Sequence, residues 1–224
     1  MNPDLWTAVD AYICGLLVPS DPALHAAVAD SAAAGLPAIS VTPSQGKLLA
    51  LLVQLRSARN ILEVGTLGGY SAIWMARAMD TGGRLVTLEA DSHHAEVARA
   101  NIDRAGLSQV VDVRVGAALD TLPALEAEDA GPFDFAFIDA DKENNAEYFG
   151  WALRLSRPGA VIVVDNVVRD GAVVDTARTD PATVGTRRLY EAMSAEARVS
   201  ATVVQTVGSK GYDGFAIAVV RDRP

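Results

Sequence analysis

The chain has 224 residues, of which 50% are hydrophobic, and its 28 acidic and 19 basic residues give a formal net charge of −9. This length and composition predict one globular domain with a single core, and the acidic charge argues against a broad surface that binds nucleic acid phosphates. Cys14 is the only cysteine, which excludes an internal disulfide and a site built from several thiolates, and which fits a reducing compartment.

Residues 1–58 precede the first predicted strand and are expected to be helical, most clearly in SQGKLLALLVQL at 44 to 55. The N-terminus has no basic leader, and no apolar run approaches the roughly 20 residues that span a bilayer. We therefore expect a soluble, cytoplasmic chain without a membrane segment. Residues 1–224 are expected to form a single domain, with helices in 1–58 and an α/β core in 59–224.

Five short runs rich in Val, Ile and Leu predict strands that are buried on both faces. These runs are 60 to 65, 84 to 89, 111 to 115, 133 to 139 and 160 to 165. Segments with helical spacing separate them, and this alternation predicts a mostly parallel sheet with helices on both faces. Two further runs, 201 to 207 and 214 to 220, are separated only by GSKGYD, so they are expected to pair as an antiparallel hairpin. The predicted sheet thus has seven strands.

Acidic residues stand at the ends of four of the five parallel strands, at the edge of an open α/β sheet where ligands bind. The first of them, Glu63, precedes the glycine-rich turn GTLGG at 65 to 69. This turn differs from the G-x-G-x-x-G spacing of dinucleotide-binding proteins, and a glycine-rich turn alone can serve packing only. An acid in front of it would repel a pyrophosphate and attract a ligand ammonium or sulfonium.

Glu89 ends the second strand, 24 residues after Gly65. A carboxylate at this place can accept hydrogen bonds from both hydroxyls of a ribose, and the alternative is an acid in a solvated loop. Together, Glu63 and Glu89 indicate a nucleoside ligand without phosphates.

Asp139 ends the fourth strand, and Asp165 ends the fifth, with Asn166 directly after it. Each acid alone could cap a helix, but neighbouring parallel strands would bring all three oxygen ligands together. Oxygen ligands without His or Cys suit Mg²⁺ or Ca²⁺, and open positions for water and substrate favour Mg²⁺. Lys142 would reach the same pocket from an opening helical turn, where it is either a general base or a solvated lysine at a helix start.

His93 and His94 stand side by side after the second strand and suggest a metal site at first sight. Neighbouring residues at the start of a helix point in different directions. We therefore expect both imidazoles to lie in solvent.

The stretches EVGTLGGYS, LEAD, IDADK and VVDNV, in this order and spacing, resemble the cation-dependent O-methyltransferases of the catechol and caffeoyl-coenzyme A type. The resemblance runs from SQGKLL at 44 to 49 through DGFAIA at 213 to 218. It implies the Rossmann-like fold of S-adenosylmethionine-dependent methyltransferases, a cofactor role for Mg²⁺ or another divalent cation such as Mn²⁺ or Ca²⁺, and a small catechol-like phenolic acceptor. It also implies a homodimer, and N-terminal helices that cover cofactor and substrate.

The resemblance further assigns roles to single residues. The expected contacts of S-adenosylmethionine are Val41, Glu63, Gly65, Thr66, Ser71, Glu89, Ala118 and Asp139, of which Glu89 would bind the ribose and Ala118 the adenine. The expected metal ligands are Asp139, Asp165 and Asn166, and the expected catalytic base is Lys142.

Two stretches depart from the pattern of this family. Many relatives carry an aromatic residue shortly after the lysine and a Trp after the D-N pair, where this chain has Asn144, Asn145 and Arg169. These positions are expected on the wall of the acceptor site. Arg169 could favour an acidic acceptor, or it could be a loop residue that faces solvent.

The sequence also bears on several other classes of protein. A nicotinamide-dependent oxidoreductase would need the G-x-G-x-x-G turn, and an enzyme that methylates a flipped base would carry an N-P-P-Y-like stretch where this chain has DADK. A binding module without chemistry would have no use for Asp139, Lys142 and Asp165. An O-methyltransferase that acts on a hydroxylated tRNA base stays open, although the acidic charge makes nucleic acid a poor first expectation.

Overall fold

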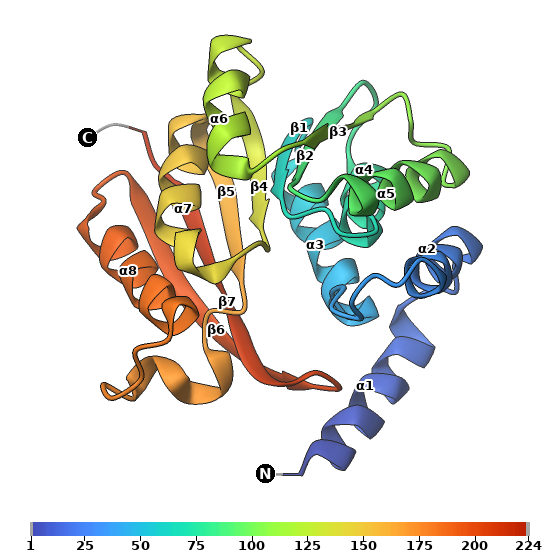
Figure 1. The fold of residues 1–224 in the computed structure, drawn as a ribbon, viewed down its shortest axis with the longest axis horizontal. Coiled ribbons are helices and arrows are strands. Elements are labelled where there is room, and N and C mark those ends of the chain that lie inside the picture. Colours follow the sequence, from blue (N-terminus) through green and yellow to red (C-terminus); the bar gives the residue numbers. More distant parts are fainter. Residues whose placement is uncertain (1, 223–224) are drawn as a thin grey trace.

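The computed structural model describes residues 2–222, which form a seven-stranded sheet with helices on both faces (Figure 1). The strand order is β3-β2-β1-β4-β5-β7-β6. The strands are β1 (Asn60–Val64), β2 (Arg84–Glu89), β3 (Val111–Val115), β4 (Phe133–Ile138), β5 (Ser156–Asp165), β6 (Val199–Gly208) and β7 (Gly211–Val220). The first five strands pair in parallel, whereas β7 is antiparallel to both β5 and β6. The predicted fold, including the closing hairpin, is confirmed.

Helices cover the two faces of the sheet in separate groups (Figure 1). One group consists of α3 (Pro43–Arg56), α4 (Tyr70–Ala78) and α5 (Ser92–Arg104), and the other of α6 (Ala118–Ala127), α7 (Asn145–Arg154) and α8 (Pro181–Ala195). Before them come α1 (Pro3–Leu17) and α2 (Pro22–Ala33), and the short helical turns η1 (Lys142–Asn144) and η2 (Arg169–Val174) follow β4 and β5. Of the helices that the structure describes, none combines the length and apolarity that a membrane crossing requires.

Strand β4 contributes to the hydrophobic core on both faces of the sheet. Phe133, Phe135 and Phe137 are all fully buried, although a regular strand would place them on a single face. The pairing of β4 with β5 shifts register between Phe133 and Phe135. Phe133 therefore packs with α7 and α8, whereas Phe135 and Phe137 pack with α3 and α4.

Asp134 lies within this irregular stretch of β4 and is almost fully buried. Its Oδ2 accepts hydrogen bonds from the backbone N–H of Arg59 at 2.7 Å and of Asn60 at 2.9 Å, and its Oδ1 forms an ion pair with Arg157. The carboxylate thereby fixes the start of β1 beside β4.

We expect Asp134→Ala to lower the free energy of unfolding by about 2–4 kcal/mol, because it leaves buried backbone donors without an acceptor. Urea denaturation measures this change. Asp80→Ala is the control, since Asp80 is exposed and its replacement should change the stability by less than about 0.5 kcal/mol. Equal midpoints for the two variants would contradict the structural role of Asp134.

Candidate active site

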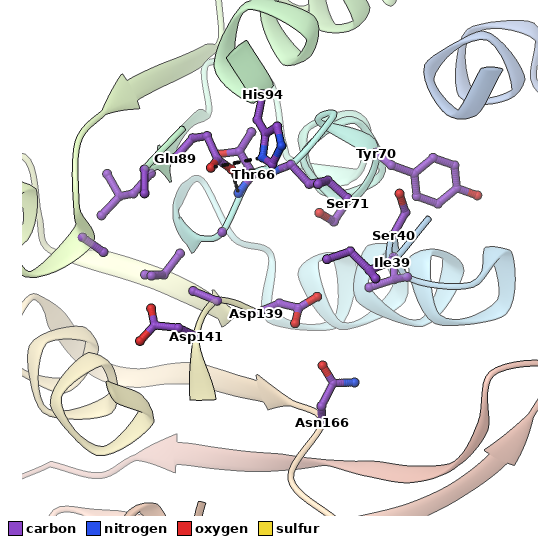
Figure 2. A pocket seen from close by; sticks show the side chains of 18 of the residues that line it. Ile39, Ser40, Thr66, Tyr70, Ser71, Glu89, His94, Asp139, Asp141 and Asn166 are labelled. Carbon is purple, nitrogen blue, oxygen red and sulfur yellow. Dashed lines mark hydrogen bonds and ion pairs between the residues drawn. The ribbon is translucent and has the colours of Figure 1, made fainter. Parts of the chain in front are cut away.

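A cavity of about 540 Å³ opens at the carboxyl ends of β1, β2 and β4 (Figure 2). The glycine-rich turn after β1 and the end of β2 form one side of it, and the segment 139–142 after β4 forms another. Pro37, Ile39, Ser40 and Val41, in the segment that leads into α3, line it as well. The cavity thus lies at the edge of the sheet where the sequence predicts a ligand.

The glycine-rich turn brings backbone from three strands into contact. The N–H of Gly65 donates to the carbonyl of Leu88 at 3.0 Å, and the N–H of Asp139 donates to the carbonyl of Val64 at 2.8 Å. Gly65 has a φ of +100°, and a Cβ atom there would lie 2.1 Å from the carbonyl oxygen of Asp139. Only glycine fits this position, because both the backbone angle and the space exclude a side chain.

Glu89 is buried at the end of β2, and its carboxylate braces the same turn (Figure 2). Its Oε2 accepts hydrogen bonds from the N–H of Thr66 at 3.2 Å and of Leu67 at 2.7 Å. Its Oε1 accepts from the N–H of Asp91 at 3.0 Å and lies 3.6 Å from Nδ1 of His94. Oε2 uses both of its lone pairs in these bonds, whereas Oε1 has a further one, so Glu89 can also accept from a ligand hydroxyl in the cavity.

Glu63 lies behind the cavity wall. Its carboxyl group is fully buried and accepts hydrogen bonds from the hydroxyls of Ser71 and Thr87, each at 2.6 Å. Burial raises its pKa to about 8. Ser71 does line the cavity, so Glu63 would act on a ligand through Ser71 and through its charge rather than by direct contact.

Asp139, Asp165 and Asn166 come together where this cavity meets a second one. Asp139 and Asn166 line the first cavity, and Asp165 and Asn166 line the second. Burial, reinforced by the charge of Asp139, raises the pKa of Asp165 above its usual value. Two carboxylates that repel one another beside an amide oxygen form a donor set that suits a hard divalent cation.

Asn166 completes this donor set. Its φ of +57° is a left-handed conformation that asparagine adopts more readily than most residues. Within residues 2–222, no group of three or more His, Cys, Asp or Glu side chains could hold a metal ion. A cation at this corner would therefore need the amide oxygen of Asn166 as its third side-chain ligand.

Lys142 lies at the same corner. It opens η1, three residues after Asp139, and its Nζ donates to Asp139 Oδ1 at 2.6 Å. Its side chain is only 11% exposed, so the ammonium is directed at the site rather than at solvent. The nearby Asp141 has a different task, because its carboxylate accepts from the hydroxyl of Tyr148 and from Nδ2 of Asn144, both at 2.5 Å.

The second cavity, of about 530 Å³, adjoins the first and shares Ile39 and Asn166 with it. The start of α3 and the turn between β6 and β7 contribute most of its other lining. In Figure 1 this turn extends beyond the sheet toward α1. The arrangement offers one cavity on each side of the corner formed by Asp139, Asp165 and Asn166.

Most residues expected at the site line one of these two cavities. The first is lined by Val41, Gly65, Thr66, Ser71, Glu89, Ala118, Asp139, Lys142 and Asn166, and the second by Asp165 and Asn166. Only Glu63 lies behind the wall. The expectation for Asn145 is wrong, because its side chain is fully buried at the start of α7 and cannot form an acceptor wall.

Sequence reasoning also missed several residues. Ile39 and Ser40 line the first cavity without belonging to any motif, and Tyr70 lines it from within the motif EVGTLGGYS, where it was assigned no role. His94 was expected in solvent, but it lines this cavity beside Glu89 (Figure 2). His93 instead lies outside it, with Nε2 at 3.0 Å from the carbonyl of Ala34. The two imidazoles do point in different directions, and one of those directions is the cavity.

Comparison with known proteins adds independent information. The sequence profile of a family described as O-methyltransferase matches residues 20–218. A catechol O-methyltransferase of Niastella koreensis is 58% identical over 99% of this chain and 100% of its own. The crystal structure of an O-methyltransferase from Bacillus cereus in complex with SAH has a TM-score of 0.97 and 59% identity, and covers 98% of this chain and 100% of that one.

A further crystal structure is similar over nearly the whole chain. An O-methyltransferase from Streptomyces achromogenes, involved in tomaymycin synthesis and solved in complex with SAM, has a TM-score of 0.96 and 50% identity. The match covers 99% of this chain and 100% of that chain.

Proposed function

Because the chain belongs to the O-methyltransferase family and is an S-adenosylmethionine-dependent O-methyltransferase, we propose that it methylates a hydroxyl of a catechol-like phenol with the help of a divalent cation. The observation that carries this proposal is the corner of Asp139, Asp165 and Asn166, which separates two adjoining cavities. Family membership removes the nicotinamide-dependent oxidoreductase that the sequence left open.

We assign S-adenosylmethionine to the first cavity. The carboxylate of Glu89 can accept from a ribose hydroxyl through Oε1, and Ala118, which lines the cavity at the start of α6, would contact the adenine. Gly65, Thr66, Ser71 and Val41 would surround the methionine portion. The buried Glu63 supplies an acid near the sulfonium and ammonium, whose positive charges would favour its ionised form.

Asp139, Asp165 and Asn166 would hold a divalent cation, with Mg²⁺ the best match to three oxygen ligands. When bound, such a cation stabilises an ionised phenolic hydroxyl, and two adjacent hydroxyls fit its open positions better than one. The acceptor would therefore lie in the second cavity, with its diol at the Asn166 end.

Lys142 is the proposed base. Its Nζ, in the neutral form, would take the proton of the reacting hydroxyl, and the contact with Asp139 holds that nitrogen at the corner. The acceptor oxygen then bonds to the methyl carbon as the bond from that carbon to sulfur breaks, and S-adenosylhomocysteine is released. Because opposite charges cancel along this path, the enclosure of the reacting atoms favours the reaction.

The first test is transfer of labelled methyl groups from S-adenosylmethionine to a panel of catechols, flavonoids and hydroxycinnamates, with Mg²⁺ and again with EDTA. We expect activity on vicinal diols that disappears with EDTA and returns with added Mg²⁺. Full activity in EDTA would contradict the role of the metal. Turnover of a hydroxylated tRNA base, with none on the panel, would contradict the small phenolic acceptor.

Glu89→Gln tests the assignment of the cofactor. We expect it to raise the Kd for S-adenosylhomocysteine by about 10- to 100-fold, because a charge-assisted acceptor for the ribose is lost. Isothermal titration calorimetry measures this constant directly. Glu96→Gln is the matched control, since Glu96 is exposed on the neighbouring helix α5. Equal affinities for the two variants would remove Glu89 from the cofactor site.

We also propose that the chain forms a homodimer. Helix α1 has no buried residue, and Leu5, Tyr12, Leu16 and Leu17 are each more than half exposed. A homodimer would cover this apolar surface. Sedimentation equilibrium should give twice the monomer mass, and Leu16→Glu combined with Leu17→Glu should shift the protein toward monomer.

We also propose that residues 1–58 and 59–224 fold as one domain, since α3 packs in the same core as α4 and α5.

A further inference from the structure

Lys210 occupies a distinctive place in the second cavity. It lies in the turn between β6 and β7, and it lines both this cavity and a third one of about 480 Å³. A cation at the boundary of the acceptor cavity has no assigned role in methyl transfer. The charged and polar groups around Lys210 indicate which kind of ligand its ammonium can bind.

The acids of the second cavity already have partners or roles. Asp10 accepts a hydrogen bond from the N–H of Ser209 at 2.8 Å, which ties α1 to the turn between β6 and β7. Asp213 Oδ1 accepts from the N–H groups of Val168, Arg169 and Gly214, at 2.9, 2.8 and 2.9 Å. Asp165 belongs to the proposed metal corner. None of these carboxylates forms an ion pair with Lys210 in the described part of the chain.

Lys210 instead has a neutral partner. Its ammonium donates to the backbone carbonyl of Ser40, in the segment that lies between the first two cavities. Although the residue as a whole is exposed, partial burial of its ammonium lowers the pKa of Lys210, against the opposing effect of Asp139 and Asp165. An ammonium has three N–H donors, so two remain for an acceptor molecule in the cavity.

The third cavity adds two further cations beyond Lys210. Arg169 and Arg178 line it together with Lys210, and neither guanidinium forms an ion pair within residues 2–222. Its acids are Asp170, Asp180 and Asp213. Asp180 caps α8 by accepting from the N–H of Thr183 at 3.0 Å, and Asp213 is engaged as described above. The wall beyond Lys210 therefore offers two guanidinium groups that form no ion pair among the described residues, beside the exposed carboxylate of Asp170.

We propose, on the basis of the proposed function, that Lys210 binds a carboxylate carried by the acceptor, so that the preferred acceptors are acidic catechols. The hydroxyls would lie at the Asn166 end of the second cavity and the carboxylate at the Lys210 end. Arg169 and Arg178 would receive the carboxylate of a longer side chain. This role makes Lys210 a specificity-determining residue, because it contacts the acceptor away from the reacting oxygen.

The test compares 3,4-dihydroxycinnamate with its neutral amide, which has the same diol and almost the same size. We expect the wild-type enzyme to prefer the carboxylate by about 10- to 100-fold in kcat/KM, the range of one charge-assisted contact. In Lys210→Met this ratio should fall to about 1, and Lys210→Arg should retain most of it. The control is Lys47→Met on α3, whose lysine lines neither cavity, and it should keep the wild-type ratio.

A binding measurement separates this inference from the proposed function. Calorimetric titration of both compounds in the presence of S-adenosylhomocysteine should show tighter binding of the carboxylate by wild-type enzyme but not by Lys210→Met. If both compounds bind in this way without being methylated, the proposed function fails and the role of Lys210 stands. If the amide is methylated as well as the acid, or if Lys210→Met keeps the preference, the inference is overturned.

Discussion

Replacement of Asp165 by alanine is expected to abolish methyl transfer, with a loss in kcat of about a thousandfold or more. Asp165 is buried at the end of β5, directly before Asn166, and the charge of Asp139 acts on it. Without it, the corner keeps one carboxylate and one amide, which is too few ligands to hold a divalent cation firmly. The activity assay uses a vicinal diol at saturating Mg²⁺, and calorimetric titration of Mn²⁺ reports metal binding independently of turnover.

The same variant should fold and bind its cofactor. Removing the buried carboxylate of Asp165, which repels that of the partly exposed Asp139, relieves an unfavourable interaction in the metal-free protein, so the unfolding temperature should not fall. The Kd for S-adenosylhomocysteine should change by less than about threefold, because Asp165 lines the second cavity and not the first. Asp165→Asn keeps the shape of the side chain and therefore serves as the control for lost packing in Asp165→Ala. Full activity of Asp165→Ala in the presence of EDTA would refute the metal mechanism.

Features that depend on local sequence pattern were predictable. The β–α alternation, the short turn before the last strand and the acids at the strand ends all follow from periodicity and from the geometry of parallel sheets. The structure places Asp139 beside Gly65 and brings it to the same corner as Asp165 and Asn166. Strands that pair in parallel end at one edge of the sheet, so their terminal residues lie close together however the helices are arranged.

Features that depend on tertiary packing were not predictable. Lys210 and Ser40 are 170 positions apart, and no local pattern indicates that the turn between β6 and β7 reaches the segment before α3. The position of His94 depends on the angle at which α5 leaves β2, which the sequence does not specify. The register shift that turns Phe133 to the opposite face from Phe135 likewise arises only when β4 meets β5.

Replacement of Gly65 by alanine should nearly eliminate cofactor binding and turnover together. A φ of +100° is unfavourable for any residue with a Cβ, and the added carbon would lie 2.1 Å from the carbonyl oxygen of Asp139. Contact at this distance forces the backbone of Asp139 to move. Asp139 is a proposed metal ligand, the partner of Lys142 and part of the wall of the cofactor cavity, so its movement would disturb all three. We expect the Kd for S-adenosylhomocysteine to rise by more than about 100-fold, with kcat/KM falling by at least as much.

Gly82→Ala separates the two causes of this effect. Gly82 has a φ of +82°, but a Cβ atom there would meet nothing within 4 Å, so its replacement introduces backbone strain of about 1–2 kcal/mol without a clash. If strain alone mattered, the two alanine variants would lose similar stability, and Gly65→Ala would retain binding wherever it remained folded. If the close approach of β1 to β4 shapes the site, Gly82→Ala will bind S-adenosylhomocysteine as the wild type does. Gly65→Ala will then fail to bind even at temperatures where circular dichroism shows it to be folded, because the site requires the bare backbone of Gly65 against Asp139.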